Sequence, residues 1–185
     1  MDIREKTVSS EVIYDGKIIK LHLDKVICPN GKEALREIVR HPGGVAVVPV
    51  DNEGYVYMVR QYRIPYDAIM LEVPAGKLDK GENPDVAAER ELREETGLTA
   101  DKIVSMGNFY PTVGFCDEDL RMYIATGLKQ GEADPDEDEF VEVEKIHIDT
   151  LADMIMNNEI RDGKTIASVL KAREYLRRDK MKNGE

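Results

Sequence analysis

The chain has 185 residues, enough for one compact domain with a small additional subdomain and too few for two full-sized domains. Its formal net charge of -11 at pH 7 disfavours partnership with nucleic acid or with an anionic membrane surface, since both are polyanions. A phosphorylated substrate would therefore have to be met by local cations or by metal ions.

The cysteines and the N-terminal residues indicate the compartment. Cys28 and Cys116 lie far apart and in no CxxC or Cys/His pattern, so both are predicted to be free thiols. The first ten residues are charged from the second position onward and lack the apolar core of a signal peptide. No stretch approaches the roughly 20 apolar residues of a spanning helix. We expect a cytoplasmic protein without a membrane partner.

Residues 1–42 are expected to form an antiparallel β-subdomain. Strands are predicted over residues 11–14, 17–28 and 34–39, because their apolar residues recur mostly at alternate positions. Turn sequences separate these strands at Asp15-Gly16 and at Pro29-Asn30-Gly31.

Residues 43–185 are expected to form the main domain, an α/β fold with a mixed sheet between helices. It begins with the apolar run 45–50, which is typical of a strand buried on both faces. The remaining elements are predicted as strands over 55–62, 103–106, 121–125 and 140–146, and as helices over 150–157 and 165–178.

A helix over residues 84–96 has the clearest ends in the sequence. Asn83 suits the N-cap, Pro84 the first helical position, and Gly97 the position just beyond the last turn. Glu91, Glu94 and Glu95 fall within one sector of this helix, because they are spaced by three and four residues. Taken alone, the three glutamates are more typical of a solvated acidic surface than of a site, because such charge runs are common.

The residues around the glutamates decide between these interpretations. Gly76 is followed after five residues by Glu82, and after seven more by the run Arg90-Glu91-Leu92-Arg93-Glu94-Glu95-Thr96-Gly97-Leu98. This pattern resembles the signature of the Nudix hydrolases at every defined position. With average residue usage, its chance occurrence in such a chain has a probability of about 10⁻⁷. The resemblance implies a Nudix fold and hydrolysis of a pyrophosphate linkage.

A pyrophosphate is anionic, so nucleophilic attack on its phosphorus requires charge neutralisation, which Mg²⁺ held by oxygen ligands supplies. The resemblance implies that Glu91 and Glu95 bind Mg²⁺, or alternatively Mn²⁺. Glu94 and the backbone carbonyl of Ala75 are the expected further ligands. It also implies that Arg90 orients these glutamates through ion pairs. Arg90 and Glu94 are therefore expected to be catalytic residues.

Two further segments resemble those of ADP-ribose pyrophosphatases. Residues 109–118 resemble the segment that follows this signature, the Nudix box (residues 76–98), although Val113 stands where a proline is typical. The acidic segment from residue 136 onward resembles the loop that brings in a catalytic carboxylate. Glu137 is then the expected general base and Glu139 a metal-associated carboxylate, with the reverse assignment left open because alternate residues of an extended chain share a side.

Arginine side chains are expected to bind the phosphates of the substrate. Arg63 ends a segment that resembles the phosphate-contacting strand of the same subfamily, and Arg36 in the N-terminal strands is a second candidate. Glu72, in the extended segment before the box, is a third predicted substrate contact. In that subfamily the N-terminal strands pack across a homodimer and complete the substrate pocket, and residues 1–42 have a suitable length and pattern.

The predicted function is Mg²⁺-dependent hydrolysis of ADP-ribose or a related ADP-sugar to AMP and a sugar phosphate. A Nudix hydrolase of another nucleoside diphosphate derivative remains an alternative: an NDP-sugar, a dinucleoside polyphosphate or an oxidised nucleotide. The third possibility is a Nudix-fold sensor without catalysis, which the intact glutamates of the box disfavour.

Overall fold

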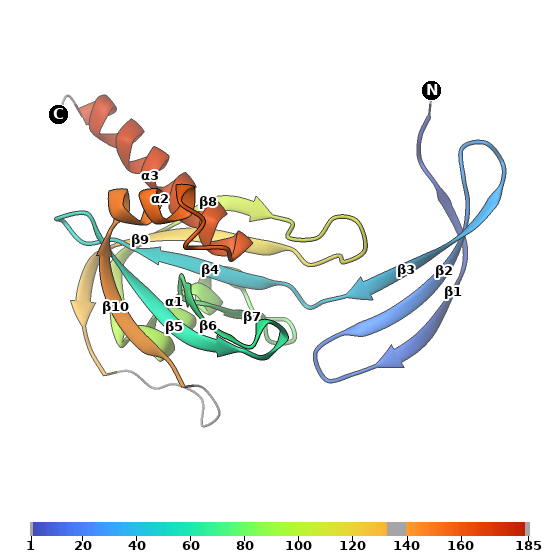
Figure 1. Cartoon of the computed structure of the whole chain (residues 1–185), viewed down its shortest axis with the longest axis horizontal. Helices are drawn as coiled ribbons and strands as arrows, with labels where there is room; N and C mark the ends of the chain where they lie inside the picture. Colours follow the sequence, from blue (N-terminus) through green and yellow to red (C-terminus); the bar gives the residue numbers. More distant parts are fainter. Residues whose placement is uncertain (1, 133–139, 184–185) are drawn as a thin grey trace. The chain divides into compact units, whose positions relative to one another are not determined.

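A computed structural model of the chain describes residues 2–132 and 140–183 (Figure 1). The chain divides into two compact units. The N-terminal unit contains residues 1–43 and 110–119, and the larger unit contains residues 44–109 and 120–185. No helix in the described part of the chain is long and apolar enough to cross a membrane.

The N-terminal unit is a three-stranded antiparallel sheet in the order β1-β2-β3. Its strands are β1 (Lys6–Asp15), β2 (Lys20–Ile27) and β3 (Glu33–Arg40). This confirms the predicted antiparallel meander, with β1 beginning earlier than expected. Residues 110–119 join the unit through β3, because Val39 donates to the carbonyl of Phe115 at 2.7 Å and accepts from the amide of Asp117 at 3.1 Å.

The larger unit contains two sheets with the strand orders β10-β5-β6 and β7-β4-β9-β8. The second sheet is mixed, since β4 runs parallel to β9 and antiparallel to β7. The strands are β4 (Gly44–Pro49), β5 (Tyr55–Arg63), β6 (Ala68–Glu72), β7 (Ala75–Lys77), β8 (Leu98–Phe109), β9 (Leu120–Gln130) and β10 (Glu142–His147).

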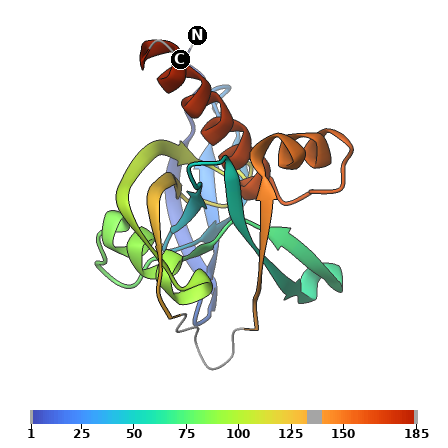
Figure 2. The ribbon, with the colours of Figure 1, turned by 90° about the vertical axis from the view of Figure 1, so that its left-hand side faces the viewer.

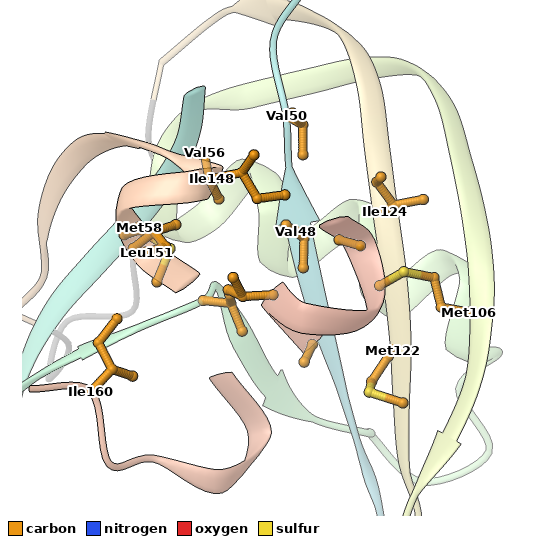
Figure 3. Close-up of a cluster of buried hydrophobic side chains, with 14 of the residues drawn as sticks. Val48, Val50, Val56, Met58, Met106, Met122, Ile124, Ile148, Leu151 and Ile160 are labelled. Carbon is orange, nitrogen blue, oxygen red and sulfur yellow. The ribbon is translucent and has the colours of Figure 1, made fainter. Parts of the chain in front are cut away.

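Strand β4 is the centre of the core, and its side chains alternate between two hydrophobic clusters. All six of its residues are buried, as the apolar run predicted. Val45 and Val47 pack with residues of α1, whereas Ala46 and Val48 pack with residues of α2 and α3. Figure 3 shows part of the second cluster.

The helices are α1 (Pro84–Thr96), α2 (Ile148–Met156) and α3 (Gly163–Asn183), and a short 3-10 helix η1 (Ile64–Tyr66) joins β5 to β6. Within the larger unit, α1 lies on one side of the mixed sheet and α2 and α3 on the other (Figures 1 and 2). The predicted α/β architecture, a mixed sheet between helices, is therefore confirmed.

Helix α1 has the predicted ends. The Asn83 side chain accepts a hydrogen bond from the amide of Asp85 at 2.8 Å, and Gly97 closes the helix with a φ of +70°. Pro84 occupies the first turn, where a missing N–H costs no hydrogen bond. These ends fix which residues of α1 face the sheet and which face the segment before β7.

Candidate active site

Two glutamates of α1 are buried. Glu91 and Glu95 are only 6% and 3% exposed, whereas Glu94, between them in sequence, is partly exposed. A solvated acidic face would leave all three in water. Burying carboxylates costs free energy unless they are paired or coordinate a cation, so this arrangement indicates a site.

The backbone before and within β7 lies against these carboxylates. The amide of Ala75 donates to Oε2 of Glu95 at 3.0 Å, and the carbonyl of the preceding Pro74 accepts from the amide of Val47 at 2.8 Å. A Cβ atom at residue 76 would overlap the carboxylate of Glu91. Gly76 is therefore required for the close approach of backbone and carboxylate.

Arg90 connects the three acidic positions that surround it. Its guanidinium donates from Nε to Glu82 at 2.9 Å, and from Nη1 to Glu91 at 2.7 Å and to Glu94 at 2.9 Å. The hydrogen bonds to Glu82 contribute most to raising the pKa of Arg90, against the opposing effect of burial. Arg90 thus stays charged and binds two glutamates of α1, Glu91 and Glu94.

The residues at this site fit a divalent cation. Carboxylate oxygens and a backbone carbonyl are the hard oxygen donors that Mg²⁺ and Mn²⁺ prefer. Gly76, which has no side chain, lets the backbone lie directly against the Glu91 carboxylate. Within residues 2–132 and 140–183, no three acidic, histidine or cysteine side chains lie close enough together to enclose an ion, and the charge beside Glu91 and Glu94 is supplied by Arg90.

A second charged group lies where β5, β6 and α3 meet. Arg63 binds both oxygens of Glu72, from Nε at 2.8 Å and from Nη2 at 2.7 Å, and Lys164 also pairs with this carboxylate. Glu72 is 1% exposed. Burial acts to raise the pKa of Glu72, but the bonds from Arg63 and the charge of Lys164 outweigh it and hold the pKa below its ordinary value.

Two residues of this group were not predicted from the sequence: Lys164, and Asp162 just before its helix. Asp162 caps α3, because Oδ2 accepts from the amide of Thr165 at 3.0 Å and from its hydroxyl at 2.6 Å. An aspartate three residues before a threonine at the start of a helix is a recognisable capping signal. It would have moved the predicted start of this helix toward the observed one, at Gly163.

The other predicted site residues fall elsewhere. Arg36 belongs to the N-terminal unit, where it pairs with Glu5, the residue before β1. Glu137 and Glu139 lie outside the described residues. Residues 110–118 of the segment after the box belong to the N-terminal unit.

Comparisons with known proteins define the class. Residues 40–169 match the model of the NUDIX domain, and residues 5–39 match that of the nucleoside diphosphate sugar hydrolase N-terminal domain. The chain therefore belongs to the Nudix family and is a Nudix hydrolase, as the box predicted. These two matches follow one another along the chain without a gap.

Individual proteins of this family are similar to the chain over most of its length. The chain is 42% identical over 182 residues to the ADP-ribose pyrophosphatase of Bacillus subtilis (strain 168), which covers 96% of this chain and 98% of the relative. It is 45% identical over 167 residues to the methanol dehydrogenase activator of Bacillus methanolicus, covering 89% of this chain and 90% of that protein. A crystal structure of an ADP compounds hydrolase shares the fold, with a TM-score of 0.84, 18% identity, and coverage of 97% and 98%.

Proposed function

We propose that the protein hydrolyses the pyrophosphate bond of ADP-ribose, or of a related ADP-sugar, to AMP and a sugar phosphate. The observation that carries this proposal is the pair of buried glutamates, Glu91 and Glu95, held against the backbone of Ala75 and Gly76. The similarity to the ADP-ribose pyrophosphatase of Bacillus subtilis over nearly the whole of both chains supports the choice of substrate.

Mg²⁺ is the proposed cofactor, with Mn²⁺ as the alternative. Glu91, Glu95 and Glu94, together with the carbonyl of Ala75, would hold the ion. When bound, the ion neutralises the pyrophosphate and lowers the pKa of coordinated water. Arg90 keeps the glutamates in position, because it binds two of them directly.

Arg63 is the proposed contact for a substrate phosphate. Its bidentate bond to Glu72 uses Nε and Nη2, and within residues 2–132 and 140–183 Nη1 makes no hydrogen bond. A planar guanidinium held along one edge presents its other edge in a fixed orientation, which suits an anionic oxygen. Glu137 remains the proposed general base, with Glu139 as the alternative.

We further propose that the protein works as a cytoplasmic homodimer. The N-terminal sheet leaves apolar side chains on β1 half-exposed, among them Val8, Val12 and Tyr14. Several exposed apolar residues on one strand suit an association surface. Packing of this sheet against a second copy would cover them, with Arg36 completing the substrate site. Light scattering should then give twice the chain mass of 20.9 kDa. A monomeric mass would contradict the role of the N-terminal sheet in dimerisation and in the substrate site.

A substrate panel tests the proposal. Purified protein with Mg²⁺ is assayed on ADP-ribose, other ADP-sugars, other NDP-sugars, dinucleoside polyphosphates and nucleoside triphosphates, and products are identified by chromatography. We expect the highest kcat/KM on ADP-ribose or another ADP-sugar, with AMP as a product. A higher value on a dinucleoside polyphosphate or a triphosphate would overturn the substrate assignment.

A further inference from the structure

Each residue of the segment from Glu72 to Gly76 is held by another element of the larger unit, among them α1 and α3. Glu72 pairs with Arg63 and Lys164 through its side chain. The three residues that follow are bound through their backbones, and Gly76 lies against a carboxylate. These backbone contacts are Val73 N–H to Thr165 Oγ1 at 3.0 Å, Pro74 carbonyl to Val47 N–H at 2.8 Å and Ala75 N–H to Glu95 Oε2 at 3.0 Å.

Two of these contacts come from consecutive residues in the first turn of α3. Lys164 reaches Glu72, and the hydroxyl of Thr165 accepts the hydrogen bond from the amide of Val73. Both side chains are in turn fixed by Asp162, which pairs with Lys164 at 3.0 Å and accepts from Thr165. Thr165 has no exposed surface, so its own hydrogen bonds form in a water-poor environment where their loss is costly.

The charges in this group balance. Arg63 and Lys164 carry two positive charges, and Glu72 and Asp162 carry two negative charges. Loss of Lys164 alone would leave a net negative charge beside Arg63. This negative charge would oppose an approaching phosphate, because like charges repel strongly in a partly desolvated site.

The group also borders a cavity that can admit part of a ligand. A cavity of about 310 Å³ is lined by Arg63, Lys164, Tyr66, Met70 and Arg161, among others. It joins an apolar wall from β6 and the 3-10 helix with cations from β5 and α3, a combination that suits a ligand with an anionic group. Lys164 therefore lies next to both the proposed phosphate contact and open space.

We infer that Lys164 and Thr165 are positioning residues for the hydrolysis, each acting on a different part of the site. Lys164 fixes the Glu72–Arg63 pair and keeps its charge balanced, so its role concerns substrate binding. Thr165 fixes the backbone that leads from Val73 to Ala75, so its role concerns the metal site. This inference rests on the proposed function, since it assigns a phosphate to Arg63 and an ion to the glutamates.

Lys164 is tested by Lys164→Met and Lys164→Arg on ADP-ribose. We expect Lys164→Met to raise KM at least tenfold while kcat falls less than threefold, and Lys164→Arg to restore KM to within about threefold of wild type. The increase in KM of Lys164→Met should become smaller in high salt, because salt screens the repulsion between the substrate phosphate and the unbalanced negative charge. An unchanged KM in Lys164→Met, with or without a lower melting temperature, would overturn the role of Lys164.

Thr165 is tested by Thr165→Val, which keeps the shape, and by Thr165→Ser, which keeps the hydroxyl. Binding of Mn²⁺ to the protein without nucleotide, followed by electron paramagnetic resonance, should weaken at least fivefold in Thr165→Val and remain near wild type in Thr165→Ser. The Mg²⁺ concentration for half-maximal activity should rise in parallel. Equal Mn²⁺ affinity in Thr165→Val and wild type would refute the role of Thr165.

Ser168→Ala is the matched control. Ser168 lies one turn further along α3, is fully buried, and its hydroxyl makes no hydrogen bond within the described part of the chain. Ser168→Ala should keep wild-type KM and Mn²⁺ affinity. If wild-type protein does not hydrolyse ADP-ribose, the proposed function fails, and the same variants are compared on the best substrate of the panel. The positioning roles are then judged there independently.

Discussion

Replacing Glu95 by glutamine should separate catalysis from stability. Glu95 is 3% exposed and accepts the amide hydrogen of Ala75 at 3.0 Å. Glutamine has nearly the same shape and keeps one carbonyl oxygen, so the bond to Ala75 can persist as a neutral one. What glutamine removes is the negative charge, on which binding of a divalent cation depends.

The expected magnitudes follow from these contacts. A hydrogen bond to a charged group contributes about 1.5–3 kcal/mol and a neutral one about 0.5–1.5 kcal/mol. The weaker bond therefore costs about 1 kcal/mol, and relief of repulsion with the neighbouring buried carboxylate offsets part of this cost. The melting temperature should change by no more than about 4 °C. Loss of a metal ligand should exceed the 10–100-fold effect of an outer-shell partner, so kcat/KM should fall at least about 100-fold, or about 2.7 kcal/mol.

The assay is a Mg²⁺ titration of ADP-ribose hydrolysis for wild type, Glu95→Gln and Glu89→Gln. Glu89 lies on the exposed face of the same helix and controls for the loss of one negative charge from α1. Glu89→Gln should behave as wild type. If Glu95→Gln retained more than a tenth of wild-type kcat/KM, Glu95 would not be a metal ligand.

Three further predictions concern the same unit. Gly76→Ala should abolish most activity, measured on ADP-ribose, because its Cβ would overlap the Glu91 carboxylate; near-normal turnover would contradict the close approach. Leu92→Ala should lower the free energy of unfolding by about 2–5 kcal/mol in a urea titration, since Leu92 is fully buried, and a loss below 1 kcal/mol would show that the core collapses around the cavity. The lowered pKa of Glu72 contributes stability that is present above its ordinary pKa of 4.5 and is lost as pH falls through the folded pKa. Thermal unfolding between pH 7 and pH 3 should therefore lose less stability in Glu72→Gln than in wild type, and parallel curves would be inconsistent with this linkage.

Much of the fold was predictable because its signals are local. The ends of α1 depend on Asn83, Pro84 and Gly97, which act within one turn of themselves. The buried strand β4 is a continuous apolar run, and both of its faces are covered by helices. The Nudix box is also contiguous, so its family could be recognised without knowledge of the rest of the chain.

The remainder depends on contacts between residues distant in sequence. Lys164 pairs with Glu72, 92 positions away in the sequence, and no local pattern near either residue predicts this pair. Residues 110–119 belong to the N-terminal unit because Val39 bonds to their backbone, and backbone pairing of this kind leaves no mark on residue type. Arg63 was predictable as a site residue from the resemblance, but its bidentate bond to Glu72 was not.

The most direct measurement is chromatography of ADP-ribose incubated with the purified protein, with and without Mg²⁺. The buried glutamates of α1 and the family of the chain lead to one expected result: stoichiometric AMP and ribose phosphate in the presence of Mg²⁺, and none after chelation with EDTA. Intact ADP-ribose in the presence of Mg²⁺, or the same rate after chelation, would contradict the account.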